Sequence, residues 1–391
     1  MSLFLMFLLL SGKVQENKLN TKAPTLEVRF EEELRVDANE DEAHFLWADK
    51  NTSVSVDDQG FMYVADIVEN RILVIDPKGK YVRTMGGKGE GPGEFLWLSS
   101  FHVLDDGSAM AIETIHFEGW ITTYDKSMKF LSKHPIKAKS AFSGLKPSGD
   151  GRFFMGERSH TEIIDGRMIE VNEHALFNPQ LESLAAIHIN RMDSFPAPPE
   201  MTRQDWLDAL APRYALRAKG LKGFTTVDQK GRFYSALGNS YEITVRDSKM
   251  KTLNTFTHTY TPKLRTASEI IDFLDRAKAS LKSVMAPQFH SIFTDSFMKE
   301  VGEMAGLHLP TPVIGGLLSL DNHLLVVRPP VGGEKSLVDI FDETGTFRGS
   351  FHFNTHGLEH MVFKGGKAYT IESVDEELEL VRYKVLLQAT K

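Results

Sequence analysis

The chain has 391 residues, of which 41% are hydrophobic and 25% are charged, and its formal net charge is -8. This length and composition allow a sizeable hydrophobic core, while the negative charge argues against non-specific binding to nucleic acid or anionic lipid, which both require basic patches. The absence of cysteine excludes disulfides, thiolate metal ligands and cysteine nucleophiles.

The first 24 residues (1–24) are interpreted as a signal-like leader followed by a polar tether. Residues 3–10 form an apolar run, LFLMFLLL, which is shorter than the roughly 20 residues that cross a bilayer and resembles the apolar region of a secretory signal. The run ends like a bacterial lipoprotein signal, although Lys13 stands where the lipidated cysteine would be. A buried strand is the alternative. We therefore expect no transmembrane span and an exported protein, periplasmic or envelope-associated.

An imperfect repeat dominates the rest of the chain. Six short apolar strands begin in the same register after an Asp-Gly, Lys-Gly, Asp-Asn or Gly-Gly turn: FMYVAD, SAMAIE, RFFMGE, RFYSAL, HLLVVR and KAYTIE. The third residue of each strand is large and is expected to pack between neighbouring sheets: Tyr63, Met110, Phe154, Tyr234, Leu325 and Tyr369. In five units a later strand closes on an Asp or Asn that can hydrogen-bond its own backbone in the following turn: Asp76, Asp125, Asn178, Asp247 and Asp342.

Repeating units of about 45 residues or more, with three or four short strands each, predict an all-β fold. Six such units indicate a six-bladed β-propeller of four-stranded antiparallel blades. The last unit has material for only three strands, and residues 25–36 (TLEVRFEEELRV) can supply the fourth. Pairing of this N-terminal strand with the last blade closes the ring and removes exposed sheet edges. Residues 25–391 then form a single domain.

Two connections are too long for simple loops, and both are predicted to contain helical insertions. The first, about 200–222, lies between blades 3 and 4 and begins at a cap-like Thr202, although Pro212 is expected to interrupt its helix. The second, about 262–312, lies between blades 4 and 5 and begins at a capping box from Thr266 to Glu269. A further short helix is expected over 297–304.

Topology predicts the face on which the insertions lie. If the strands of a blade run from A at the centre to D outside, the A–B and C–D turns share one face, here called the turn face. The B–C loops and the blade-to-blade connections share the other, here called the B–C face. Both insertions follow a fourth strand, so they belong to the B–C face.

Charged residues at the ends of the second strands form the candidate binding site. Each lies six residues past its turn and is expected near the mouth of the ring on the B–C face: Asp66, Glu113, Glu157, Arg328 and Glu372. Nearby loop residues supplement this set: His116, Arg158 and Tyr241. Such a set suits a cation, an amine or a polyhydroxylated ligand, whereas the structural alternative is that each acid only satisfies backbone amides of its own loop. No residue is assigned a catalytic or metal-binding role.

Two further motifs resemble known functional signatures but lack a feature that those signatures need. Residues 356–360, HGLEH, match the H-x-x-E-H pattern of some zinc peptidases, but that mechanism needs a helix, and the stretch contains Gly357 between strand-like flanks. The glycine-rich GGKGEGPGEF at 86–95 lacks the Gly-Lys-Ser/Thr ending of a phosphate-binding loop. It is better explained as a connection that needs unusual backbone angles.

The stretch YVADIVENRILVIDPKGKYVRTMGGKGEGPGEF resembles the NHL-type repeat, particularly that of bacterial six-bladed propellers, many of them exported or lipid-anchored. The resemblance is close over 57–95, loose in the other blades and absent from the helical insertions. It implies a propeller and most often a binding role. Some propellers of related type are lyases or lactonases that use an axial metal, but no residues of this chain match such a motif one by one.

Two hypotheses follow from the sequence. The first is a monomeric, non-catalytic binding protein of the bacterial cell envelope, without a cofactor, which binds a small molecule or an envelope protein on the B–C face. The alternative is a metal-assisted hydrolase or lyase with a divalent cation such as calcium near the central channel. A purely structural scaffold is a third possibility.

Overall fold

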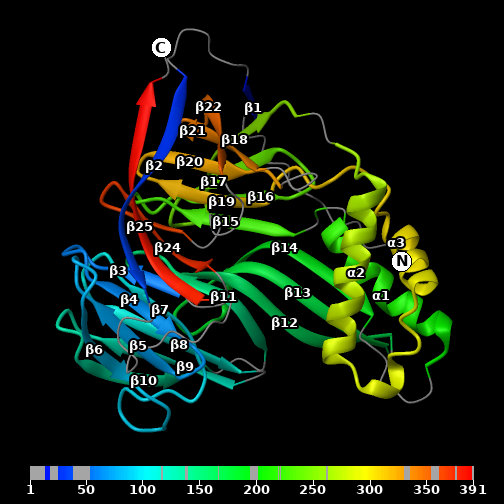
Figure 1. Ribbon diagram of the computed structural model, residues 1–391, viewed down its shortest axis with the longest axis horizontal. Coiled ribbons are helices and arrows are strands. Elements are labelled where there is room, and N and C mark those ends of the chain that lie inside the picture. The colour runs from blue at the N-terminus through cyan, green and yellow to red at the C-terminus, as the bar shows by residue number, and fades with distance from the viewer. Residues whose placement is uncertain are drawn as a thin grey trace, which may run out of the picture.

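The computed structural model describes residues 14–17, 25–37, 53–115, 118–136, 140–165, 167–193, 201–218, 220, 222–260, 263–329, 335–353, 361–374 and 377–389. Six sheets form the blades of a six-bladed β-propeller (Figure 1), as the repeat predicted; each contains four antiparallel strands, and one sheet has a fifth strand. The first strands of neighbouring blades contact one another, which makes them the innermost strands of the ring.

The first three blades follow the chain in order. Blade 1 contains β3 (Ser53–Val56), β4 (Met62–Asp66), β5 (Arg71–Ile75) and β6 (Tyr81–Gly86). Blade 2 contains β7 (Leu98–Val103), β8 (Ala109–Ile115), β9 (Glu118–Tyr124) and β10 (Phe130–Pro135). Blade 3 contains β11 (Ala141–Pro147), β12 (Phe154–Ile164), β13 (Arg167–Phe177) and β14 (Ser183–Asp193).

The last three blades follow the first insertion. Blade 4 contains β15 (Gly223–Val227), β16 (Phe233–Leu237), β17 (Glu242–Arg246) and β18 (Thr252–His258). Blade 5 contains β19 (Gly316–Leu320), β20 (His323–Val327), β21 (Ser336–Asp342) and β22 (Phe347–Phe353). Blade 6 contains β23 (Val362–Lys364), β24 (Lys367–Val374) and β25 (Glu377–Ala389), and β2 (Leu26–Asp37) is its fourth strand.

The N-terminal strand closes the ring, as the sequence predicted. β2 runs antiparallel to β25 from the pair Leu26 and Ala389 to the pair Asp37 and Glu379. Its Phe30 packs against aromatic rings of blade 5 and blade 6, including Phe353 at a centroid distance of 4.8 Å. The outer edge of blade 6 is thereby paired, and the two ends of the described chain stabilise each other.

A second N-terminal segment, β1 (Val14–Asn17), lies within the predicted leader and tether. It pairs in parallel with β18 and makes blade 4 a five-stranded sheet.

The repeated Asp and Asn residues form the predicted turns. In each of the five C–D turns the side-chain oxygen accepts hydrogen bonds from the backbone N–H groups two and four residues later, at 2.8 to 3.0 Å. The large third residues of the second strands lie in apolar clusters between neighbouring blades, also as predicted. The turn hydrogen bonds in five blades and the position of the third residue in all six therefore agree with one repeat register.

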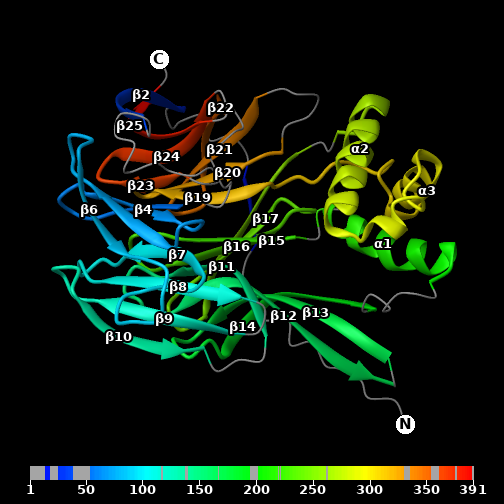
Figure 2. The same ribbon diagram turned by 60° about the horizontal axis from the view of Figure 1, so that its bottom comes forward.

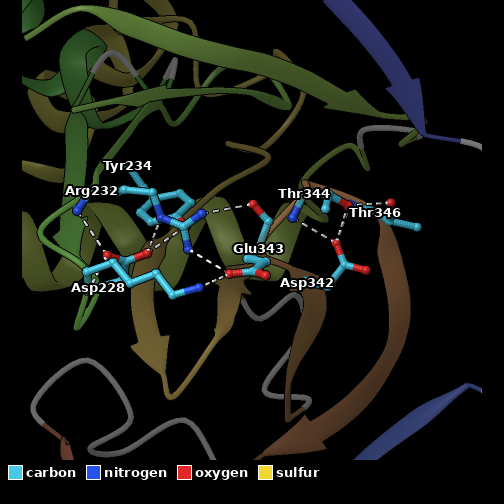
Figure 3. Close-up of polar contacts among 8 residues, drawn as sticks. Asp228, Arg232, Tyr234, Asp342, Glu343, Thr344 and Thr346 are labelled. Atoms are coloured by element: carbon cyan, nitrogen blue, oxygen red, sulfur yellow. Dashed lines mark hydrogen bonds and ion pairs between the residues drawn. The ribbon is translucent and has the colours of Figure 1, made fainter.

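Ion pairs on the turn face connect blade 4 to blade 5 (Figure 3). Arg232 donates to Asp228 within its own turn at 2.6 Å and lies 3.5 Å from Glu343 of the next blade. Lys230 also pairs with Glu343. Tyr234 donates its hydroxyl to Asp228 at 3.1 Å, so the inter-blade contact is joined to the buried strand β16.

The insertions form helices α1 (Arg203–Ala218), α2 (Ala267–Val284) and α3 (Asp295–Ala305), with a short 3-10 turn at Pro287–Phe289. They share an apolar core centred on Trp206, which is fully buried. The predicted capping box at Thr266 and Glu269 is present. The expected break at Pro212 is wrong, because α1 continues through it to Ala218. The Arg213 guanidinium there donates to the Ala209 carbonyl at 2.7 Å.

The helices lie beside the long hairpin of blade 3. Strands β12, β13 and β14 have 11 residues each, whereas the strands of blade 4 have five to seven. In both ribbon views the ends of β12 to β14 extend toward α1 and α2 (Figures 1 and 2), and residues of both helices and of all three strands line one cavity. This places the helical layer over the B–C face at blade 3. Among the described helices, none is long and apolar enough to cross a membrane.

Candidate functional site

The predicted site residues of blades 1 and 2 are buried and engaged within their own blade. Asp66 is fully buried, accepts from Arg71 at 2.9 Å and also accepts from the backbone N–H of Glu69. Glu113 is fully buried, pairs with Lys133 at 2.8 Å and accepts from the backbone N–H of residue 96. Both carboxylates therefore have the partners that a structural role requires.

Arg328 and Tyr241 converge on one buried carboxylate, Asp339. Arg328 contacts Asp339 through Nε and Nη2, both at 2.6 Å, and the Tyr241 hydroxyl donates to the same oxygen. Ser350 donates to the other oxygen, and the guanidinium lies 4.9 Å from the ring centre of Tyr260. Burial and the Asp339 carboxylate raise the pKa of Tyr241 well above its usual range.

The remaining predicted residues have three different outcomes. Glu372 accepts from Tyr383 at 2.6 Å and lies 3.3 Å from Arg35 of β2, and Arg158 pairs with Glu173. His116 and the HGLEH stretch lie outside the described residues. Glu157 differs from the other acids at the strand ends, because 41% of its side chain is exposed and its one described ionic neighbour, His174, is 3.9 Å away.

Glu157 lines a cavity of about 460 Å³ between blade 3 and the helical layer, here called the blade 3 cavity. One wall comes from the sheet and is polar, with residues of β12, β13, β14 and the start of blade 4: Glu157, Glu170, Asn172, Glu173, His174, His188, Asn190 and Lys222. The other wall comes from α1 and α2 and includes Leu210, Tyr214 and Leu281. A volume of this size is in the range of small-molecule sites.

The charges that line the blade 3 cavity are balanced. Arg213 of α1 pairs with Glu170 of β13 at 2.7 Å, which also joins the helical layer to the hairpin. Glu173 is held by Arg158 and by the hydroxyl of Ser183. Lys222 also lines the cavity, so the three cationic side chains at or next to its walls (Arg158, Arg213 and Lys222) match the three glutamates in number, and neither charge is in excess.

His174 is one of the residues that line the polar wall. Its Nε2 lies 3.1 Å from the Thr225 hydroxyl, and its Nδ1, which is buried, has no hydrogen-bond partner. Burial, together with Lys222 and His188, lowers the pKa of His174 to about 4, so the ring is neutral at neutral pH. Thr225, His174 and Glu157 present a hydroxyl, an imidazole and a carboxylate in the order found in hydrolytic triads. In such a triad the carboxylate orients the imidazole through a hydrogen bond. The distance of 3.9 Å between His174 Nδ1 and the Glu157 carboxylate is too long for that bond.

Metal binding by side-chain clusters has no support in the part of the chain that the structure describes. No three His, Asp or Glu side chains there are arranged to hold an ion.

Of the residues that line the blade 3 cavity, the sequence predicted only Glu157 as part of a binding site. The missed residues lie on β13, β14, α1, α2 and the start of blade 4, outside the strand ends that the repeat aligned. The available signal was the unusual length of the third unit, which the structure shows as an extended hairpin. No residue pattern showed that the first insertion would fold back against that hairpin.

Comparisons with known proteins agree with the propeller. Residues 52–180 match the model of a family described as 6-bladed beta-propeller, DUF5128. No curated protein matches the chain. A crystal structure of a Bacteroides fragilis protein, provisionally named as an exported protein, aligns with 97% of this chain and 100% of its own at 10% identity and a TM-score of 0.50.

Two further solved structures are similar at lower scores. A member of the DUF4221 family from Bacteroides vulgatus has a TM-score of 0.49 at 10% identity, with 94% of this chain and 100% of that chain covered. Virginiamycin B lyase from Staphylococcus aureus has a TM-score of 0.40 at 9% identity, with 92% and 100% covered. The sheet topology, the matched family and the Bacteroides fragilis structure establish the chain as a six-bladed β-propeller.

Proposed function

We propose that this propeller is a non-catalytic binding protein whose ligand occupies the blade 3 cavity. The observation that carries the proposal is a cavity of about 460 Å³ that the helical layer and the B–C end of blade 3 line together, with a mainly polar sheet wall opposite a helical wall that includes Leu210, Tyr214 and Leu281. This narrows the predicted site from the whole ring to its third blade. The ring residues Asp66, Glu113, Arg328 and Glu372 then act as structural ion pairs.

The chemistry of the cavity favours a neutral, polyhydroxylated ligand such as a mono- or disaccharide. The balanced charges give no preference for an anion or a cation. Amide and imidazole groups on the sheet wall, such as Asn172 and His188, offer both donors and acceptors for hydroxyl groups. On the opposite wall Tyr214 and Leu281 can pack against the C–H face of a sugar ring.

Export to the cell envelope is part of the proposal. It rests on the apolar run at residues 3–10 and on the similarity in fold to a Bacteroides fragilis protein named for export. We further propose that the protein acts as a monomer and that its ligand is a small molecule of the envelope.

Calorimetric titration with a panel of mono- and disaccharides tests the proposed ligand class. We expect one-to-one binding of at least one sugar, and a loss of about tenfold in affinity in Glu157→Gln, since a hydrogen bond to a charged group contributes about 1.5 to 3 kcal/mol. Glu162→Gln is the matched control, because Glu162 lies on the same strand with 37% of its side chain exposed but outside the cavity. A panel without any binding, or equal losses in both variants, would contradict the proposal.

Elemental analysis distinguishes this function from the alternative of a metal-assisted hydrolase or lyase. A binding protein of the proposed kind is expected to contain no stoichiometric calcium or zinc after purification. A metal at one equivalent per chain that is lost in Glu157→Gln would favour the enzyme instead.

A further inference from the structure

A second cavity lies on the turn face, between blades 1 and 2. Its volume is about 400 Å³, and its walls come from strands β4 to β6 and the A–B turn of blade 1 and from both turns of blade 2. It is here called the turn-face cavity. No described residue lines both this cavity and the blade 3 cavity.

At the seam between blades 4 and 5, side chains make contacts across the same part of the turn face. Arg232 and Lys230 from the A–B turn of blade 4 both pair with Glu343 in the C–D turn of blade 5, and Figure 3 shows the contact between Arg232 and Glu343. Asn254 of β18 donates to the backbone carbonyl of Thr344 in that turn at 3.1 Å. These contacts close the seam.

The repeat register identifies the equivalent positions at the seam between blades 1 and 2. Residues 57–63 match residues 228–234, and in each stretch the tyrosine hydroxyl donates to the first aspartate, at 3.0 and 3.1 Å. The contact residues have different counterparts here: Gln59 for Lys230, Phe61 for Arg232, Arg83 for Asn254 and Lys126 for Glu343. Because Phe61 is apolar and Lys126 is a cation, the ion pairs of the other seam cannot form, and the turn-face cavity lies between the blades.

Two cations line the turn-face cavity, one from each blade. Arg83 belongs to β6 of blade 1, and Lys126 belongs to the C–D turn of blade 2. Both side chains are exposed, and neither has an ion pair with a described residue. One exposed cation would be ordinary, but two that border one cavity attract an anion to it.

The two acids that line the turn-face cavity already have partners. Asp57 accepts from two backbone N–H groups of its own turn, each at 2.9 Å, and from the Tyr63 hydroxyl. Asp58 pairs with Lys364 of blade 6 at 2.8 Å. The charges available to a ligand are therefore the two cations.

We propose that the turn-face cavity binds a small carboxylate that carries an apolar group. Arg83 and Lys126 hold the carboxylate, whose two oxygens match the planar fork of a guanidinium. The apolar group contacts Val74 and Met128, which are buried at the cavity wall, and Phe61. This site does not depend on saccharide binding in the blade 3 cavity.

Methyl NMR on the natural protein tests the site, because Met128 places a methyl group at the cavity wall. Its resonance can be assigned by its loss in Met128→Leu. We expect hexanoate to shift this resonance saturably and hexanol, which lacks the charge, to bind at least about tenfold more weakly. The resonance of Met298, in the core of the helical layer, should not move. No saturable shift at Met128, an equal shift at Met298, or equal affinities for the two probes would overturn the proposal.

Neutral variants test the two cations. Arg83→Gln and Lys126→Gln should each weaken hexanoate binding by about tenfold, as expected for the loss of a charge-assisted hydrogen bond. Lys129→Gln is the matched control, because Lys129 is exposed in the same turn but does not line the cavity. It should bind within about twofold of the natural protein, since surface charges are screened. Equal weakening in all three variants would contradict the assignment.

A double variant copies the seam between blades 4 and 5 into blades 1 and 2. Phe61→Arg with Lys126→Glu supplies the counterparts of Arg232 and Glu343, whose ion pair should close the cavity and abolish the hexanoate-dependent shift at Met128. Unchanged binding in this variant would show that hexanoate binds elsewhere.

Discussion

Replacing Arg328 by methionine tests whether the charged strand ends are structural. The guanidinium contacts Asp339 through two nitrogens at 2.6 Å, and Asp339 is fully buried while 17% of the Arg328 side chain is exposed. Methionine keeps an apolar chain against Tyr241 and Tyr260 but leaves the carboxylate, among the described residues, with two neutral donors, Tyr241 and Ser350. Removal of one partner from a buried ion pair costs about 3 to 5 kcal/mol.

Equilibrium unfolding in urea measures this cost directly. The urea concentration at the midpoint of unfolding should fall, while the dependence of the unfolding free energy on urea concentration stays constant. Lys230→Met is the matched control, because Lys230 and its partner Glu343 are 53% and 41% exposed. Such a surface pair should cost at most about 1 kcal/mol. The double variant Arg328→Met with Asp339→Asn should recover part of the loss, since the uncompensated charge is gone.

A cost of Arg328→Met no larger than that of Lys230→Met would refute this reasoning. Arg328 would then be available to bind a ligand, as the sequence predicted. The charged residues at the ends of the second strands would again be the candidate binding site.

Three further outcomes are expected. The pKa of His174 is about 4 in the folded protein, against an ordinary value of 6.5. Between pH 6.5 and pH 4 the unfolded chain therefore binds one proton more than the folded chain, so the free energy of unfolding falls as the pH drops through this window. His174→Gln should remove up to about 3 kcal/mol of that dependence in urea unfolding at pH 7 and pH 4; an unchanged pH profile contradicts it. Thr266→Ala removes the capping box and should cost about 1 kcal/mol, and no change in unfolding would contradict a folded α2. Arg213→Met breaks the contact with Glu170 and should speed amide exchange in α1 and weaken saccharide binding, whereas unchanged exchange would show that this ion pair does not hold the layer.

The fold could be predicted because each blade repeats the same local chemistry. Asp76 and Asp342, far apart in the chain, each fix a turn by accepting the same two backbone hydrogen bonds. The register of those turns placed large residues such as Tyr63 and Phe154 between blades, where they are buried. Local signals of this kind depend only on neighbouring residues and can be seen in the sequence.

The site could be predicted only in part, because its partners are distant in sequence or belong to other strands. The position of Glu113 at the end of a second strand follows from the repeat. Its partner Lys133 comes from the fourth strand of the blade, so the ion pair that neutralises the Glu113 carboxylate could not be predicted from the sequence. The contact between Arg213 and Glu170 depends on an insertion that folds back over the preceding hairpin. The break expected at Pro212 is wrong because proline disfavours a helix only locally, whereas the packing of α1 around Trp206 depends on residues distant in sequence.

The location of the ligand is the central claim, and hydrogen–deuterium exchange with a saturating sugar from the panel tests it most directly. We predict slower exchange in β13 and in α1, which line the blade 3 cavity from its two walls, and unchanged exchange in β5 and β6 of blade 1. Protection confined to blade 1, or to the ends of the other second strands without α1, would contradict binding between blade 3 and the helical layer.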